Sequence, residues 1–296
     1  MLFHTAGVRA ILRGMNSSAI QDAVAAARKI VIKIGSNTLA REDGTIDIDF
    51  MNGFACQCGA LMGAGKQLAL VSSGAQVAGI STLDRWSRKT DIHYRQALCA
   101  IGQVELMDKW RSAFSRCGIH IGQLLFTKED FQDDHRTLNM RNTLFTLLDE
   151  GVVPVINEND SVTFDEIRIG DNDNLSALTA ILWNADLLIL FSDIDGIFID
   201  NPKTHPGAAL VETVRDTAEL LSRITMGAAN DFGTGGVRTK IEAAEKAAAY
   251  GIPVVLANGK SEQALERLAA GGIGGTLFLA RVTKSLPHTV GVLPSL

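Results

Sequence analysis

Two lysines lie in settings that favour binding of an anion. Lys33 lies inside the apolar run IVIKIG, a pattern typical of a strand buried on both faces. A buried lysine is costly unless it is paired or belongs to a site, although a lysine at the edge of a sheet can also reach solvent. Lys240 lies one turn into a helix that follows a glycine-rich loop. Both lysines are therefore candidate ligands of a phosphate.

The glycine-rich loop is the segment GTGGVRTK, Gly233–Lys240. Its glycines leave backbone N–H groups free to point at an anion, and the start of the next helix adds partial positive charge. A flexible loop with an ordinary cap and a solvated lysine is the alternative. The standard nucleotide fingerprints are absent, because GALMGAGKQ has Ala60 and Gln67 where a P-loop needs glycine and serine or threonine. Phosphate binding would therefore use the glycine-rich loop.

The segment INENDSVTFDEIRIGDNDN, Ile156–Asn174, crowds six carboxylates and four asparagines between two apolar runs. Apolar and charged residues alternate in its middle, which predicts one arm of a β-hairpin. NEND and GDNDN would be the two ends of this hairpin, here called its feet. The crowding is explained if the feet converge on an amino group or a magnesium ion; a solvated acidic loop is the alternative. The missing glycine and glutamate of the EF-hand pattern disfavour a calcium loop. Asp173 also predicts the N-cap of an apolar helix, Asn174–Ala185.

Other catalytic chemistry has little support in the sequence. The six histidines are scattered without metal or triad spacing, and no G-x-S-x-G elbow occurs. The four cysteines are Cys56, Cys58, Cys99 and Cys117, without a second doublet or a paired histidine nearby. We interpret them as reduced structural thiols, in preference to a metal or redox site.

Strands and helices alternate along the chain. We predict apolar strands at Lys29–Asn37, Gln67–Ala75, Ile119–Thr127, Val152–Asn159, Leu187–Gly196 and Ile252–Gly259. We predict helices at Asp47–Gly65, Asp91–Cys117, Thr137–Glu150, Asn174–Ala185, Gly236–Gly251 and Ser261–Ala270. The pattern is that of an α/β fold with an open, mostly parallel central sheet sandwiched between helices. Most of the strands end in small polar loops, and ligands of such sheets bind outside the carboxyl ends of the strands.

The composition fits a globular protein with no nucleic-acid or membrane partner. The 296 residues are 46% hydrophobic and 21% charged, the net charge is −5 and the pI is about 5.7. We find no basic excess and no apolar run of transmembrane length. Residues 1–24 contain Arg9 and Arg13 but no acid before Asp22, so they are either a disordered extension or a targeting peptide. We otherwise expect a cytoplasmic protein.

Five motifs occur in order between Lys29 and Thr283: IKIGSNTL, LVSSGAQVAG, VPVINENDSV, IRIGDNDNLSALTAILWNADLLILFSDIDGIF and GTGGVRTKIEAAEKAAAYGI. Together they resemble the glutamate 5-kinases of the amino acid kinase superfamily, with Val237 where that family often has methionine. The resemblance implies one amino acid kinase domain at residues 25–296, with an amino-acid lobe at 25–185 and a nucleotide lobe at 186–296. It also implies that the C-terminal PUA domain of many members is missing here.

The resemblance implies roles for single residues. Lys33 and Lys240 would act on the transferring phosphoryl group, with Asp173 holding both lysines in place. The glutamate site would be lined by Ser73, Asn157, Asp160, Asp171 and Asn172. The nucleotide would be bound by Lys33, Ser192, Asp193, Thr234, Gly235, Gly236, Val237 and Lys240.

The implied reaction is phosphoryl transfer from ATP to the side-chain carboxylate of L-glutamate, the first step of proline biosynthesis, with Mg²⁺ on the nucleotide. The resemblance further implies feedback inhibition by proline, a partner glutamyl-phosphate reductase, and a homo-oligomer, either a dimer or a tetramer. A related kinase with another carboxylate acceptor and a non-catalytic amino-acid sensor are the alternatives. The acidic feet disfavour a phosphorylated acceptor, because they would repel its charge.

Overall fold

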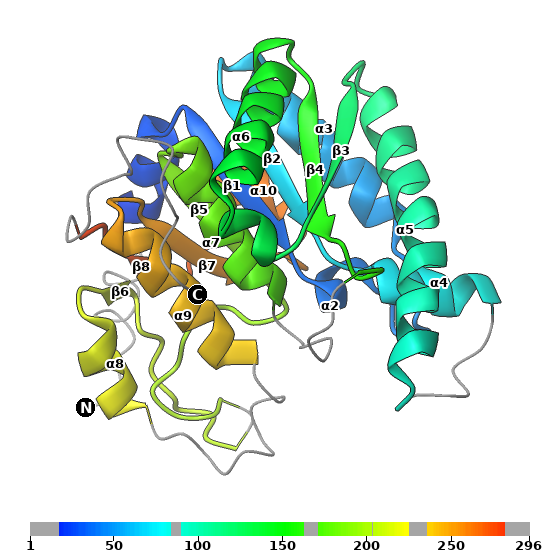
Figure 1. The fold of residues 1–296 in the computed structure, drawn as a ribbon. Helices are drawn as coiled ribbons and strands as arrows, with labels where there is room; N and C mark the ends of the chain where they lie inside the picture. Colours follow the sequence, from blue (N-terminus) through cyan, green and yellow to red (C-terminus); the bar gives the residue numbers. More distant parts are fainter. Residues whose placement is uncertain (1–17, 84–89, 163–170, 203, 225–235, 282–296) are drawn as a thin grey trace, which may run out of the picture.

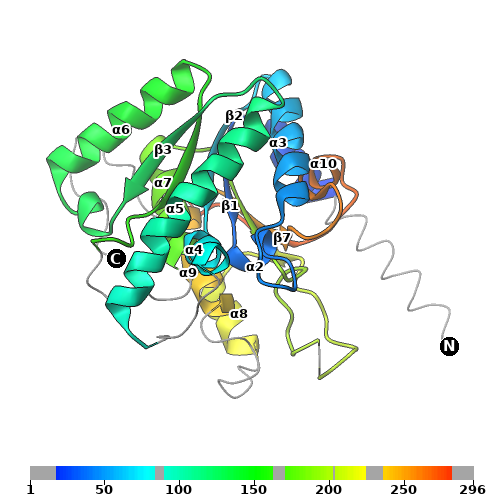
Figure 2. The ribbon, with the colours of Figure 1, turned by 90° about the vertical axis from the view of Figure 1, so that its right-hand side faces the viewer.

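The computed structural model of the chain describes residues 18–83, 90–162, 171–202, 204–224 and 236–281. Within these ranges an eight-stranded sheet has the strand order β3-β4-β2-β1-β5-β7-β8-β6. Helices cover both faces of the sheet (Figure 1 and Figure 2). The strand pairs are parallel except for β7 with β8. The predicted α/β fold with a mostly parallel sheet between helices is confirmed.

The main strands lie within the predicted ranges. The strands are β1 (Lys29–Ile34), β2 (Gln67–Ser72), β3 (Ile121–Phe126), β4 (Val153–Glu158), β5 (Leu187–Ser192), β6 (Thr213–Val214), β7 (Val254–Asn258) and β8 (Thr276–Phe278). The sequence pattern does not predict β6 and β8, because strands of two and three residues are too short to show a period.

The predicted helices are present with shifted ends. The helices are α2 (Ser36–Leu39), α3 (Ile48–Gly63), α4 (Ala75–Leu83), α5 (Ile92–Ser115), the 3-10 helix η1 (Glu129–Phe131), α6 (Asp134–Asp149), α7 (Asp171–Trp183), α8 (Thr217–Arg223), α9 (Gly236–Ala249) and α10 (Ala264–Ala269). α6 starts before the predicted Thr137, because Asp133 accepts a hydrogen bond from the Arg136 N–H as its N-cap. The helices α2, α4 and α8 are additions to the sequence-based prediction.

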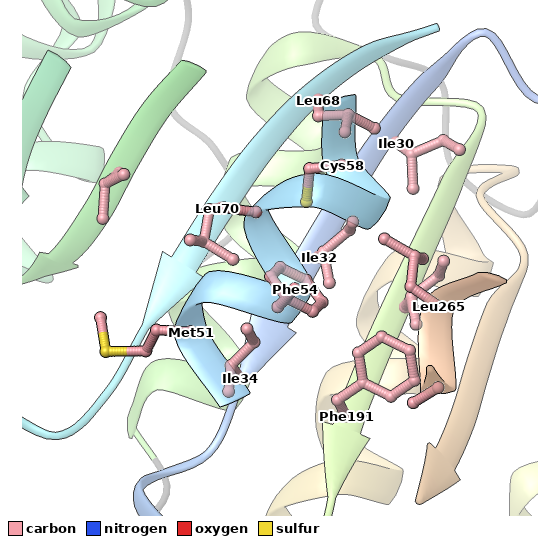
Figure 3. Packing of buried hydrophobic residues seen from close by; sticks show 14 of the residues in the cluster. Ile30, Ile32, Ile34, Met51, Phe54, Cys58, Leu68, Leu70, Phe191 and Leu265 are labelled. Carbon is pink, nitrogen blue, oxygen red and sulfur yellow. The ribbon is translucent and has the colours of Figure 1, made fainter. Parts of the chain in front are cut away.

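Alternate residues of each strand face the two helical layers. The isoleucines of β1 pack against α3, α5 and α10, whereas Val31 packs on the opposite side with residues of α7 and α9. Figure 3 shows the first contact, in which Phe54 of α3 lies over the isoleucines of β1. Burial on both faces explains why the strands are continuous apolar runs. Lys33 lies two residues after Val31 on the strand, so its side chain points to the same face of the sheet, toward α7.

Residues 18–26 form a helix that belongs to the core. Ile20 and Val24 on this helix are buried in the same cluster as the isoleucines of β1. Lys66, from the segment that resembles a P-loop, donates hydrogen bonds to three backbone oxygens at the end of this helix. Residues 18–24 therefore pack with the core of the domain, whereas the sequence alone assigns them to the N-terminal extension.

Two glycines allow α4 and α5 to pack in direct backbone contact. A Cβ atom at Gly102 would lie 1.7 Å from the carbonyl oxygen of Ala75. A Cβ atom at Gly79 would lie 2.0 Å from the carbonyl oxygen of Leu98. No side chain fits at either position, so this contact sets how α5 lies against α4.

Gly102→Ala should destabilise the fold, because the added methyl group overlaps backbone atoms that cannot move aside. We expect urea denaturation to show a loss of about 2–4 kcal/mol in the free energy of unfolding. Gly53→Ala is the matched control, because Gly53 also lies within a helix but a Cβ there meets nothing within 4 Å. The control should be neutral or stabilising by up to about 1 kcal/mol. Equal stability of the two variants would contradict the close packing.

Candidate active site

The carboxyl ends of the central strands meet at one edge of the sheet. β1 pairs in parallel with β2 and β5, and β2 pairs in parallel with β4. Ser73, Asn157 and Ser192 lie at the carboxyl ends of β2, β4 and β5. The residues singled out in the sequence therefore gather at the edge where open α/β sheets bind ligands.

At this edge the carboxylate of Asp173 lies between two buried lysines. Its Oδ1 is 2.5 Å from Nζ of Lys33, and its Oδ2 is 3.0 Å from Nζ of Lys240. Thr239 donates its hydroxyl to the same Oδ2 at 3.0 Å. The side chain of Asp173 is 0% exposed, and those of the lysines are 5% and 10% exposed. Residues from β1, α7 and α9 thus meet in one buried ionic group.

The structure corrects the N-cap predicted at Asp173. α7 begins at Asp171, so Asp173 lies inside the first turn of the helix. Its carboxylate turns toward the lysines, because a buried carboxylate is stabilised more by two ammonium groups than by a helix N–H. The local sequence suggests a cap because the distant lysines do not appear in it.

Burial and charge oppose one another in this ionic group. Burial raises the pKa of Asp173, but Lys33 and Lys240 together outweigh it and hold the pKa below its ordinary value. Burial lowers the pKa of Lys33; the Asp173 carboxylate opposes this effect and the like charge of Lys240 adds to it. Two ammonium groups share one carboxylate, so an excess of positive charge is left for an anionic ligand.

A second group of site residues is a network of amides and a hydroxyl. Asn172 donates from Nδ2 to Oγ of Ser73 and to Oδ1 of Asn157, each at 2.9 Å. Asn157 donates in turn to Oε1 of Gln103 at 2.8 Å. Nε2 of Gln103 and Oδ1 of Asn172 are buried and have no hydrogen-bond partner among the described residues. We call these two atoms the open donor and the open acceptor of the network, because buried polar groups without a protein partner favour a polar ligand.

The two acidic residues of the predicted amino-acid site lie close in sequence to members of this network. Asp160 lies in the turn after β4, and Asp171 is the first residue of α7. The side chain of Asp171 and the hairpin tip at residues 163–168 lie outside the described residues. The hairpin with converging feet therefore stays a prediction.

The third predicted group follows β5 and precedes α9. Ser192 donates to Oδ1 of Asp193, and Asn37 donates to Oδ2 of Asp193, both at 3.1 Å. Gly236 and Val237 begin α9. Thr234 and Gly235 lie outside the described residues, so their part in a phosphate-binding loop stays a prediction.

Sequence reasoning missed three residues that contact the predicted site. Thr239 and Asn37 lie inside the quoted motifs GTGGVRTK and IKIGSNTL, so their positions next to Lys240 and after Gly35 contain a signal. Gln103 lies in the middle of α5 and has no local feature that marks it. Only its contact with Asn157 identifies it.

Asp173→Asn should destabilise the protein, because it keeps the shape of the side chain but leaves two buried ammonium groups without a counter-charge. We expect a loss of about 3–5 kcal/mol in urea denaturation at neutral pH. Asp193→Asn is the control, because Asp193 bonds to Asn37 and Ser192 and makes no ion pair within 4 Å among the described residues. It should cost less than half as much.

The pH dependence of this loss has a definite sign. The pKa of Asp173 is depressed in the folded state, so its contribution is fully present above the unfolded value of about 4 and is lost as the pH falls through the folded pKa. The stability difference between wild type and Asp173→Asn should therefore stay constant from pH 7 to about pH 5 and shrink only in more acidic solution. A difference that vanished already near neutral pH would contradict the depressed pKa.

Comparison with known proteins identifies the family of the chain. A profile of the amino acid kinase family matches residues 28–258. The chain is 57% identical over 261 residues to a glutamate 5-kinase of Alkaliphilus metalliredigens, an alignment that covers 88% of this chain and 99% of the relative. It is 47% identical over 287 residues to a glutamate 5-kinase of Treponema pallidum, with 86% and 97% of the two chains covered.

A solved structure shows the same fold. The carbamate kinase of Giardia lamblia, bound to AMP-PNP, matches with a TM-score of 0.61 at 15% identity, over 86% of this chain and 99% of that one. None of the described helices is long and apolar enough to cross a membrane. By its family profile and its identity to curated relatives, the chain belongs to the amino acid kinase family and, within it, to the glutamate 5-kinases.

Proposed function

We propose that the protein transfers the terminal phosphoryl group of ATP to the side-chain carboxylate of L-glutamate. The product is L-glutamyl 5-phosphate, and the reaction is the first step of proline biosynthesis. The observation that carries this proposal is the buried group of Lys33, Asp173 and Lys240, which lies at the same sheet edge as the open amides of Gln103 and Asn172. The direct test is release of ADP that depends on glutamate.

The two lysines would stabilise charge on the phosphoryl group as it moves. Phosphoryl transfer depends on alignment and charge neutralisation more than on covalent help from the protein. The glutamate carboxylate has a reference pKa of about 4.3, so it is already ionised at neutral pH and needs no general base. Asp173 would therefore organise the two ammonium groups rather than accept a proton, in keeping with its depressed pKa.

Mg²⁺ would arrive with the phosphates of ATP. The described residues contain no group of three or more His, Cys, Asp or Glu side chains that could hold a metal. The excess charge of the buried ionic group is positive, which suits phosphate oxygens better than a free cation. Such a donor set fits a nucleotide that carries its own metal, which supplies further charge neutralisation. The nucleotide would be held by Ser192, Asp193, Thr234, Gly235, Gly236 and Val237.

The amide network would hold the amino acid. Its open donor, Nε2 of Gln103, suits a carboxylate of glutamate, and its open acceptor, Oδ1 of Asn172, suits the ammonium group. Ser73 and Asn157 would fix both amides through their hydrogen bonds. The carboxylates of Asp160 and Asp171 would add negative charge for the ammonium group.

Further proposals concern the partners, the inhibitor and the oligomeric state of the chain. An acyl phosphate is reactive, so a glutamyl-phosphate reductase would consume the product. Proline would act as a feedback inhibitor, and the chain would associate as a dimer or tetramer in the cytoplasm. Within the chain, residues 25–185 would bind the amino acid and residues 186–296 the nucleotide.

Lys33→Ala and Lys240→Ala should each lower kcat by about 100-fold or more, because each removes positive charge that stabilises the transition state. The measurement is glutamate-dependent ADP release in a coupled assay. Lys109→Ala is the control, because this lysine pairs with Glu105 on the surface of α5 and should leave kcat unchanged. Wild-type rates in either site variant would refute its role, and ADP release with aspartate or acetylglutamate in place of glutamate would refute the acceptor.

Gln103→Met should weaken glutamate binding, because it removes the open donor and leaves Asn157 without its acceptor. We expect KM for glutamate to rise by about 10-fold with a smaller change in kcat. Gln123→Met, at an exposed position of β3, is the matched control and should leave both constants unchanged. An unchanged KM in Gln103→Met would exclude Gln103 from the glutamate site.

A further inference from the structure

We propose that Cys56 and Cys117 are a modification site, at which a small oxidant closes a reversible disulfide between α3 and the turn after α5. The Sγ atoms of the two residues are 2.9 Å apart. The bond length of a disulfide is about 2.05 Å, so the sulfurs need to approach by less than about 1 Å. The structure holds both residues as free thiols, 61 positions apart in the chain.

The backbone on both sides of the pair is already in place. Cys117 lies in a tight turn at the end of α5, where the N–H groups of Cys117 and Ile119 both donate to the carbonyl oxygen of Phe114. Gly118 takes a φ of +72° there, a conformation that favours glycine. The turn therefore holds Cys117 without help from its side chain.

The turn packs against α3 at Gly59, which lies one turn after Cys56 on the same face of the helix. A Cβ atom at Gly59 would lie 3.7 Å from Cβ of Cys117. The backbone of the turn thus lies in van der Waals contact with this face of α3, and the 2.9 Å between the two Sγ atoms places the thiols themselves side by side. Figure 2 shows the C-terminal end of α5 beside α3.

The other two cysteines have different surroundings. Cys58 lies on the opposite face of α3, buried in the core beside Ile32 and Phe54 (Figure 3). Cys99 is buried about five turns earlier on α5 than Cys117. Cys56 is exposed, so it is the thiol that a dissolved oxidant reaches first.

The chemistry balances with a low-molecular-weight disulfide as the oxidant. The thiolate of Cys56 attacks one sulfur of the small disulfide, which forms a mixed disulfide and releases one small thiol. Cys117 then attacks the sulfur of Cys56, closes the protein disulfide and releases the second small thiol. The cysteine pair loses two electrons and two protons, and the small disulfide gains them.

Burial and the hydrogen bond to Cys56 raise the pKa of Cys117 to about 11, so the second step should accelerate as the pH rises.

The site is separate from the proposed active site. Cys117 lies between the end of α5 and the start of β3, at the amino ends of the strands, whereas the ionic group of Asp173 lies at their carboxyl ends. The disulfide would link α3 covalently to the turn after α5 in the native fold. Its test needs no measurement of kinase activity, so it stands or falls independently of the proposed function.

The test is to incubate the purified chain with glutathione disulfide and record the intact mass and a non-reducing peptide map. We expect a protein lighter by two hydrogen atoms, with the peptide of Cys56 linked to the peptide of Cys117. Tm should rise by about 5–10 °C, as for a native disulfide that closes a long loop. A reductant should reverse both changes.

Cys56 and Cys58 occur in the same tryptic peptide, because no lysine or arginine separates them. Variants therefore identify which sulfur is bonded. Cys58→Ala should keep the link, whereas Cys56→Ser and Cys117→Ser should lose it; fragmentation of the linked peptide gives the same answer without a variant. Glutathione that stays on Cys56, a link between two chains, or a link that leaves Tm unchanged would each overturn the proposal.

Discussion

One buried carboxylate joins the elements at the carboxyl edge of the sheet. Lys33 and Lys240 are both buried, and neither ammonium group would be tolerated in the interior without a counter-charge. Asp173 supplies that charge to both, with one oxygen for each lysine. β1, α7 and α9 are thereby joined at one point, and the separation of the two ammonium groups is set. Two ammonium groups against one carboxylate leave an excess of positive charge at this point.

The sheet decides which side chains can reach this point. Strand residues alternate between faces, so Lys33 faces α7 while the isoleucines on either side of it enter the core beneath α3. Parallel pairing brings the polar ends of β1, β2, β4 and β5 to the same edge. The amino ends of the strands have structural contacts instead, such as the bonds from Lys66 to the helix at residues 18–26.

The long helix α5 connects these two regions. It lies directly on α4 because Gly79 and Gly102 have no side chains, and it is held at β2 by a 2.8 Å hydrogen bond from Nε1 of Trp110 to Oγ of Ser72. Both contacts flank Gln103 in the chain, so its amide reaches Asn157 from a fixed helix. The same helix ends in the turn that carries Cys117 next to α3. α5 therefore contacts the amide network from its middle, through Gln103, and leads at its C-terminal end into the turn of the cysteine pair.

The sequence by itself determined the α/β fold and the positions of the main strands, and it marked Lys33 and Lys240 as unusual residues. An apolar run and a lysine within a strand are local signals, and these signals were sufficient to predict the strands and to single out Lys33. The family resemblance implied that Asp173 holds both lysines, whereas the local pattern predicted only a cap; the tertiary structure shows the ion pairs, and it alone shows the contact of Gln103 with Asn157. The contact of Asp173 with Lys240 joins residues 67 positions apart, and the contact of Asn157 with Gln103 joins residues 54 positions apart. A local pattern records periodicity and turns, whereas the choice between a cap and a distant partner depends on which charges folding brings together.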